Sequence, residues 1–186
     1  QAASGALTAL DTAIQDIVLS AALARFPQAS CIAEEDTPYK RRFAKRGAEQ
    51  AIILDPIDGT FHFQRGDHPY HVSLGLARRG QMEAAVLARP TEDKIFTAVR
   101  GKGAYLHVGS RRPKRLQLPK KPRTNKAFIS SKARIFQEHA KPALAPREFP
   151  IGAALVLTLL AEGELCEPSP VLHLLRGEPH LLLLVH

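Results

Sequence analysis

The sequence predicts a layered α/β sandwich, because two helical patterns flank a run of antiparallel strands without a regular alternation of strand and helix. Apolar residues recur at helical spacing over residues 7–25, which predicts a helix. Residues 70–105 alternate strand-like segments with tight turns, which is typical of an antiparallel meander. Residues 152–162 are apolar nearly all round and stop at Gly163, as in a buried helix. A doubly wound Rossmann sheet is therefore not expected.

The other elements follow from turn signals and charge. We expect strands at residues 29–33, 51–54, 70–77, 82–88, 95–99, 126–130 and 181–185, a strand entered from the turn at 101–105, and a short helix at 131–140. Residues 61–69 have turn chemistry. Residues 37–50 and 111–125 are basic and contain turn formers, so we expect surface loops there.

Composition predicts one compact protein. A chain of 186 residues with 45% hydrophobic content can bury one sizeable core, so residues 1–186 are expected to form a single domain. No apolar run approaches the roughly 20 residues of a membrane-spanning helix, and no signal-peptide pattern opens the sequence. Cys31 and Cys166 form no CxxC pair, so neither a disulfide framework nor a zinc site is expected. These features predict a cytoplasmic protein without a membrane partner.

The net charge of +8, from 26 Lys and Arg against 18 Asp and Glu, favours phosphorylated or polyanionic partners. The basic residues cluster at 40–46 and 111–126, where Phe43 is the one interleaved aromatic residue. Nucleic-acid surfaces combine positive charge with stacking platforms or a recognisable module, and this sequence shows neither. We therefore expect solvated loops and no nucleic-acid partner. The opposite hypothesis predicts strongly salt-dependent binding to DNA or RNA.

Carboxylates follow the buried strand predicted at residues 51–54. Asp55 and Asp58 stand three positions apart with Pro56 between them, and a glycine and a hydroxyl residue come next. A turn here can direct both carboxylates and the Ile57 carbonyl toward one point, and these hard oxygen ligands suit Mg²⁺. Asp-Pro and Asp-Gly also form ordinary turns, and this stretch alone leaves the two interpretations about equal.

Two further acidic features are ambiguous when taken alone. Glu34, Glu35 and Asp36 end the strand predicted at 29–33, and adjacent like charges repel one another unless cations or donors neutralise them. A bound metal would do so, although an ordinary acidic loop is the preferred interpretation of this stretch by itself. Asp11, near the start of the first helix, is interpreted as a solvated acid or one favoured by the helix dipole.

Taken together, these stretches resemble the inositol monophosphatase family of Mg²⁺-dependent phosphatases, whose sandwich fold is shared with fructose-1,6-bisphosphatases. The family's acidic pair after a strand matches Ala33-Glu34-Glu35, and its Asp-Pro-(Ile/Leu)-Asp-Gly-(Thr/Ser) signature matches residues 55–60 without substitution. The likeness extends over most of residues 6–167. It implies an αβαβα sandwich with a largely antiparallel sheet, a metal-binding half at 1–125 and a partial C-terminal half at 126–186.

The resemblance implies a role for each matching residue. The metal ligands would be Glu34, Asp55, Asp58 and the Ile57 carbonyl, holding two or three Mg²⁺ ions. Glu34, Thr60 and Asp11 would act on the attacking water, and substrate contacts would come from Gly59, Thr60, Gly152, Ala153 and Glu167. Two ions can clamp a phosphate monoester and lower the pKa of a bound water, so no covalent intermediate is required. The expected enzyme is a homodimer that hydrolyses myo-inositol monophosphate or a related sugar phosphate.

Departures from the family pattern leave alternatives open. Seven residues after the position of Glu167, family members carry a metal-ligating aspartate in a Trp-Asp pair, whereas this sequence has His173-Leu174. The C-terminal part is therefore expected to be incomplete. His62 stands where inositol-acting members usually carry asparagine, so 3'-phosphoadenosine 5'-phosphate and fructose-1,6-bisphosphate are alternative substrates. A catalytically silent homologue that binds a phosphorylated ligand or a protein is a further alternative.

Overall fold

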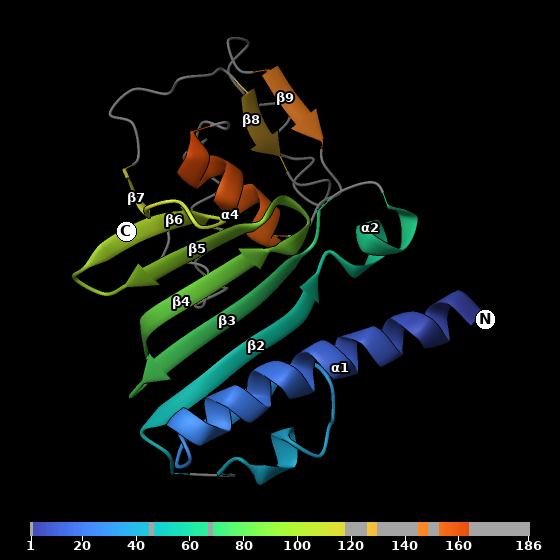
Figure 1. Ribbon diagram of the computed structural model, residues 1–186, viewed down its shortest axis with the longest axis vertical. Helices are drawn as coiled ribbons and strands as arrows, with labels where there is room; N and C mark the ends of the chain where they lie inside the picture. Colours follow the sequence, from blue (N-terminus) through green and yellow to red (C-terminus); the bar gives the residue numbers. More distant parts are fainter. Residues whose placement is uncertain are drawn as a thin grey trace.

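The computed structural model describes residues 2–44, 47–66, 69–117, 126–129, 145–148 and 153–163. These residues form the mixed α/β fold expected from the sequence (Figure 1). The elements in chain order are α1 (Ala2–Arg25), β1 (Ser30–Ala33), η1 (Lys40–Arg42), β2 (Gln50–Asp58), α2 (Thr60–Arg65), β3 (His71–Arg78), β4 (Gln81–Arg89), η2 (Pro90–Glu92), β5 (Lys94–Val99), β6 (Gly103–Val108), β7 (Lys114–Leu116), β8 (Lys126–Ile129), β9 (Ala145–Glu148) and α4 (Ala153–Glu162).

The main sheet has seven strands in the order β1 to β7, so each strand pairs with its neighbours in sequence. β1 and β2 are parallel, and the remaining pairs are antiparallel. The β3–β4 hairpin turns through Arg79 and Gly80, both at positive φ, which matches the predicted turn. The antiparallel meander is therefore confirmed. β8 and β9 form a separate parallel pair.

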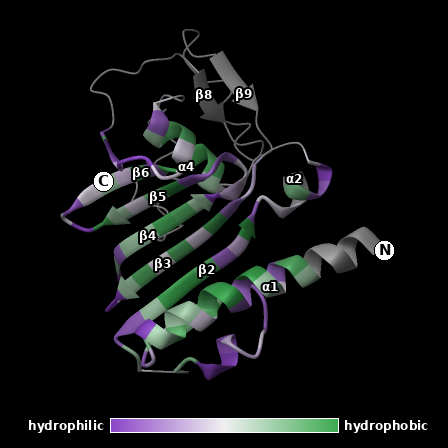
Figure 2. Cartoon of the chain, viewed as in Figure 1, coloured by the Kyte–Doolittle hydropathy of each residue, from purple (hydrophilic) through white to green (hydrophobic). Residues whose placement is uncertain are grey.

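Helices α1 and α4 cover opposite faces of this sheet. Leu74 pairs with Val86 across β3 and β4, and Leu87, the next residue on β4, points to the other face. On one face, α1 packs over a core that contains Leu19, Phe43, Ile52, Leu54 and Leu74. On the other face, α4 packs over a core that contains Leu87, Phe96, Ala98, Ala154 and Leu157. Figure 2 shows hydrophobic residues along β2, β3 and β4 and in helices α1 and α4.

Several boundaries differ from the sequence prediction. β2 does not end at Leu54 but continues to Asp58, because a register shift accommodates Pro56, which cannot donate to the ladder. The segment expected to be a turn begins with α2, whose first turn is closed by the Phe63 N–H on the Gly59 carbonyl at 3.0 Å. A helix of six residues is too short for its apolar residues to show a helical spacing in the sequence. The elements η1, η2, β7 and β9 were likewise not predicted.

Other expectations concern residues outside the described part of the chain. The helix predicted at 131–140, the strand predicted at 181–185 and His173-Leu174 all lie there. The strand predicted at 126–130 is confirmed as β8. The single-domain organisation, with its division near residue 125, stays a prediction. Within the described residues, no helix has both the length and the apolar character needed to cross a membrane.

Candidate active site

Asp55 and Asp58 lie on the same face of the sheet at the carboxyl end of β2. Two residues three positions apart in a regular strand would point to opposite faces. Here the register shift intervenes, so that Asp55 pairs with Ser73 and Asp58 pairs with His71. Ser73 and His71 are two positions apart on β3 and therefore share a face. The bulge thus brings both carboxylates to the face that α4 covers.

Helix α4 contacts the second of these acids directly. The Ala154 N–H donates to Asp58 Oδ2 at 2.6 Å. An N–H in the first turn of a helix has no intrahelical acceptor, and the positive end of the helix dipole favours a carboxylate there. Segment 153–162 of the chain is therefore joined to residue 58 by a charge-assisted hydrogen bond.

Hydrogen bonds also fix the backbone around the two acids. Asp55 Oδ1 accepts from the Ile57 N–H at 3.1 Å, and the Thr60 hydroxyl donates to the Ile57 carbonyl at 2.8 Å. Gly59 connects β2 to α2 at a φ of 90°, which favours glycine over residues with a Cβ. A carbonyl oxygen has two lone pairs, so the Ile57 carbonyl can accept from Thr60 and still face a cation.

Helix α1 contributes a third buried acid and holds the acidic loop in place. Asp11 is 7% exposed, and Gln15, one turn later, is fully buried. The Gln15 amide accepts from the Glu35 N–H at 3.0 Å and donates to the Glu35 carbonyl at 2.8 Å. The Lys40 ammonium donates to the Ala33 carbonyl at 2.6 Å. Gln15 and Lys40 were not predicted from the sequence. A signal existed for Gln15, because Asp11, Gln15 and Leu19 follow one another at intervals of four residues and so share a helix face.

The electrostatics tie these carboxylates into one site. Burial, followed by the charges of Asp58, Glu34 and Asp11, raises the pKa of Asp55 to about 7, against the lowering effect of the Ile57 N–H. Burial, followed by the charges of Glu34 and Glu35, raises the pKa of Asp11 to about 6. The Asp55 carboxylate is therefore repelled by three other acids, Asp11 on α1, Glu34 in the loop after β1 and Asp58 at the end of β2.

The donor chemistry of the site fits a hard divalent cation. All the candidate ligands are oxygens, and Asp11 Oδ1 is buried without a hydrogen-bond partner among the described residues. In the part of the chain that the structure describes, no three His, Cys, Asp or Glu side chains gather closely enough to hold a metal by themselves. Mg²⁺ does not require such a cage, because it usually keeps several waters and takes one or two carboxylates.

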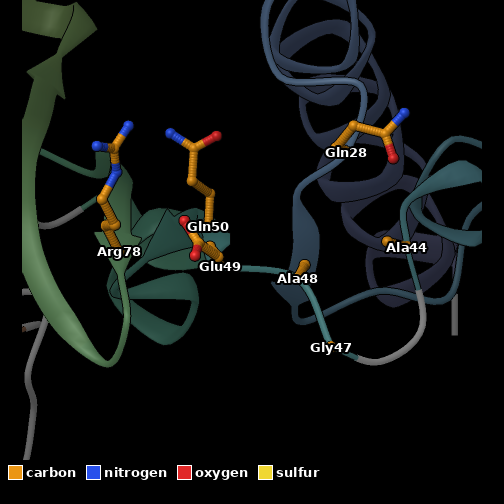
Figure 3. A pocket seen from close by; sticks show the side chains of 7 residues that line it. All are labelled: Gln28, Ala44, Gly47, Ala48, Glu49, Gln50 and Arg78. Carbon is orange, nitrogen blue, oxygen red and sulfur yellow. The ribbon is translucent and has the colours of Figure 1, made fainter.

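A hollow lies at the other end of β2 (Figure 3). It has a volume of about 430 Å³ and is lined by Gln28, Ala44, Gly47, Ala48, Glu49, Gln50 and Arg78. Gln50 begins β2 and Asp58 ends it, so roughly 26 Å of strand separates this hollow from the acids. Its one carboxylate, Glu49, forms an exposed ion pair with Arg79 at 2.8 Å. The hollow is therefore distinct from the acidic site.

Comparison with known proteins identifies the family. The model of the inositol monophosphatase family matches residues 1–165. The chain belongs to the inositol monophosphatase family. Among curated relatives, human inositol monophosphatase 2 is 33% identical over 157 residues, which cover 75% of this chain and 51% of that protein. The Nus factor SuhB of Salmonella typhimurium is 30% identical over 103 residues, or 54% of this chain and 36% of that protein.

Solved structures of inositol monophosphatase family members share the fold. The SuhB protein from Bartonella henselae superposes with a TM-score of 0.71 at 21% identity, over 94% of this chain and 69% of that one. Inositol monophosphatase from Anabaena gives a TM-score of 0.67 at 25% identity, over 88% of this chain and 66% of that one. The family resemblance and the fold class are thus confirmed. The chain spans about half the length of its human relative.

The structure places most of the residues that the sequence analysis singled out. Glu34, Asp11, Asp55 and Asp58 influence one another electrostatically, as described above. Gly59 and Thr60 follow β2 directly, and Ala153 opens α4, immediately before the N–H that contacts Asp58. Gly152 and Glu167 lie outside the described residues. The individual roles assigned to these residues stay predictions.

Proposed function

We propose that this protein is a Mg²⁺-dependent phosphate monoester hydrolase that acts on myo-inositol monophosphate or a related sugar phosphate. The observation that carries the proposal is that Asp55 and Asp58 share one face of the sheet, with Asp58 bonded to the N-terminus of α4. The family supports phosphatase chemistry in general. The choice of substrate, the metal and the activity of the whole protein belong to the proposal.

Two or three Mg²⁺ ions would be held by Glu34, Asp55, Asp58 and the Ile57 carbonyl. When bound, they would neutralise phosphate oxygens and lower the pKa of a water molecule. The mutual repulsion of the acids supports this assignment, because a cation converts that repulsion into attraction. The Ile57 N–H and the Thr60 hydroxyl would keep Asp55 and the Ile57 carbonyl in place.

The remaining residues would position the substrate and the attacking water. The α4 N-terminus favours an anion, and Ala153 and Gly152 would contact the substrate there, together with Glu167. The N–H groups of Gly59 and Thr60 would receive phosphate oxygens. Asp11, Glu34 and Thr60 would orient the water in line with the leaving group, a step that requires positioning and charge stabilisation more than covalent chemistry.

The test is phosphate release from inositol 1-phosphate by the full chain, with and without Mg²⁺. We expect Mg²⁺-dependent turnover that Asp55→Asn lowers by at least about 100-fold, because that change removes a ligand charge. Glu49→Gln is the matched control, since it removes a carboxylate at the opposite end of β2 and should leave turnover unchanged. Turnover that survives both Asp55→Asn and metal removal would refute the proposal. Adding 3'-phosphoadenosine 5'-phosphate and fructose-1,6-bisphosphate to the assay separates the alternative substrates.

A second candidate is a homologue that binds phosphorylated ligands or a protein without hydrolysing them. It is favoured by the absence of three converging metal-ligating side chains within the described residues. Inositol 1-phosphate binding without turnover, at saturating Mg²⁺, would support it.

The cytoplasmic location and the homodimer are also part of the proposal and rest on the family resemblance. Sedimentation of the purified protein tests the dimer.

A further inference from the structure

A buried arginine joins the sheet to α4 away from the four acids. Arg89, the last residue of β4, is 2% exposed, and every nitrogen of its guanidinium donates a hydrogen bond. Nε donates to His71 Nε2 at 3.2 Å, and one terminal nitrogen donates to the Thr158 hydroxyl. The other terminal nitrogen reaches Glu92 at 2.9 Å and Glu162 at 3.3 Å. Together with Lys94, which bonds Glu162 at 2.7 Å, these residues form what we call the Arg89 network: His71, Arg89, Glu92, Lys94, Thr158 and Glu162.

Stability alone does not account for the Arg89 network. Removing the Arg89 guanidinium and the Glu162 carboxylate from water is costly, and well-packed apolar residues of similar volume often stabilise a core equally well or better. A hydrogen-bonded guanidinium instead fixes the orientation of its partners, because its planar group donates hydrogen bonds only in fixed directions. Arg89 also lies over the ring of Phe96, with 5.5 Å between the guanidinium carbon and the ring centroid, which further restricts its orientation.

The partners on α4 share a face with the residue that contacts Asp58. Ala154, Thr158 and Glu162 follow one another at intervals of four residues, so they lie along one stripe of the helix. Thr158 and Glu162 fix the second and third turns of that stripe to Arg89, and the Ala154 N–H fixes the first turn to Asp58. Only about 6 Å along the helix axis separates residues 154 and 158, so a shift at one end is transmitted to the other.

The Arg89 network also reaches the acidic site through the sheet. His71, which accepts from Arg89, is the β3 residue that pairs with Asp58 beyond the bulge. Asp58 is therefore held from two directions, by the β3 backbone beside it and by the α4 N-terminus facing it. Arg89 donates hydrogen bonds to His71 on β3 and to Thr158 and Glu162 on α4. Its described hydrogen bonds do not include Asp55 or Asp58.

We propose that the Arg89 network fixes the position of α4 along and around its own axis. In that position the Ala154 N–H contacts Asp58 and holds its carboxylate in place for binding a cation. Arg89 and Thr158 are thus positioning residues for the active site. The consequence for metal binding rests on the proposed function. The consequence for the contact between Ala154 and Asp58 does not, so the two can be tested separately.

The test compares Thr158→Val, which removes the hydroxyl at constant shape, with Thr158→Ser, which retains it. The first readout is hydrogen exchange of the Ala154 amide by NMR, because its bond to Asp58 is what the network is proposed to set. The second is the affinity for Mn²⁺, used as a calorimetric probe in place of Mg²⁺. We expect Thr158→Val to speed Ala154 exchange and to weaken Mn²⁺ binding about 10-fold, the lower end for partners that orient metal ligands. Thr158→Ser should stay within about twofold of wild type in both readouts.

Thr97→Val is the matched control. It removes another threonine–histidine hydrogen bond, to His107 at 3.0 Å, on the face of the sheet opposite α4. This variant should leave both readouts at the wild-type level. If Thr158→Val does not fold, Glu162→Gln, which retains an acceptor oxygen but loses the charge, is measured in the same way and should again speed Ala154 exchange.

A purely structural role predicts a different result. If Thr158→Val lowers the melting temperature but leaves Ala154 exchange and Mn²⁺ affinity unchanged, the positioning inference is overturned. If the wild-type protein binds no Mn²⁺ and hydrolyses no phosphate ester, the proposed function fails. Ala154 exchange in Thr158→Val against Thr158→Ser then still decides whether the Arg89 network sets the contact with Asp58.

Discussion

Replacing Asp58 with asparagine should separate the structural role of this residue from its proposed metal-binding role. The asparagine side chain would keep an oxygen that accepts from the Ala154 N–H, so the 2.6 Å contact can survive without the charge. A hydrogen bond to a charged group contributes about 1 kcal/mol more than a neutral one, and the helix dipole adds about 0.5 kcal/mol. The lost repulsion offsets part of this, because the charge of Asp58 raises the pKa of Asp55. In metal-free buffer, the free energy of unfolding should therefore change by no more than about 1 kcal/mol.

Mg²⁺ should then distinguish the variant sharply from the wild type. A ligand present at about 100 times its dissociation constant stabilises the folded state by about 2.7 kcal/mol. Urea unfolding of the wild-type protein at such a Mg²⁺ concentration should show this gain, and Asp58→Asn should show less than about half of it. Asp58→Ala, which removes the acceptor as well, should lose about 2 kcal/mol even in EDTA, since a donor is left without its partner.

Two results would contradict this reasoning. If Asp58→Asn is as unstable in EDTA as Asp58→Ala, the Ala154 contact depends on charge and not on the acceptor oxygen. If Asp58→Asn gains as much stability from Mg²⁺ as the wild type, Asp58 is not a ligand. Glu49→Gln again serves as the control, because its carboxylate lies at the far end of β2 and should not alter the Mg²⁺ response.

Three further predictions use the same unfolding assay. Burial, followed by the charge of Arg89, lowers the pKa of His71 from 6.5 to about 3. The unfolded chain then binds the extra proton between these values, so the contribution of His71 to stability should be lost as the pH falls through this window, by up to about 1.4 kcal/mol per pH unit. Asp55 and Asp11, whose pKa values are raised, contribute in the opposite sense in this window. His71→Gln should remove only the His71 contribution, so the variant should gain stability relative to the wild type as the pH falls, and an unchanged slope would exclude His71 as a source. Glu162→Gln should lower the free energy of unfolding by about 2 kcal/mol because it weakens a buried ion pair. Glu49→Gln, in an exposed ion pair, should lower it by less than about 0.5 kcal/mol. Equal losses would show that burial does not decide the strength of these pairs. Gly59→Ala should cost about 1–2 kcal/mol because of the positive φ at that position, and a neutral effect would mean that the turn can relax.

The sequence was sufficient to predict the acids but not their arrangement. The DPIDGT motif identifies Asp55 and Asp58 as candidates without any structure. Whether they share a face of the sheet depends on the bulge in the pairing of β2 with β3. Strand pairing cannot be recognised from the residues around Asp55 alone, and Pro56 is the one local residue that indicates an irregular strand. The meander was predictable for the opposite reason, since each of its hairpins is specified by its own turn residues.

Arg89 and Asp11 show why long-range burial escapes a local pattern. Arg89 precedes Pro90 at the end of a strand, a place where a basic residue usually faces solvent. It is buried because α4, far along the chain, supplies Thr158 and Glu162 as partners. Asp11 is expected from the sequence to be a solvated acid near a helix start, but α1 begins at Ala2, and Asp11 is buried within it beside the charges of Glu34 and Glu35. In both cases the partner that decides the environment is absent from the local sequence window.

The acidic site and the Arg89 network affect the stability of the fold in opposite senses. At the end of β2, burial and the charges of Asp58, Glu34 and Asp11 raise the pKa of Asp55, so without a cation the site destabilises the fold around Asp55. Strain of this kind persists at functional sites only where the surrounding structure holds it in place. The buried ion pair of Arg89 with Glu162 anchors α4 independently of the metal. The protein can therefore keep Asp58 against the α4 N-terminus before any cation arrives, and a preformed site loses less free energy to ordering when it binds one.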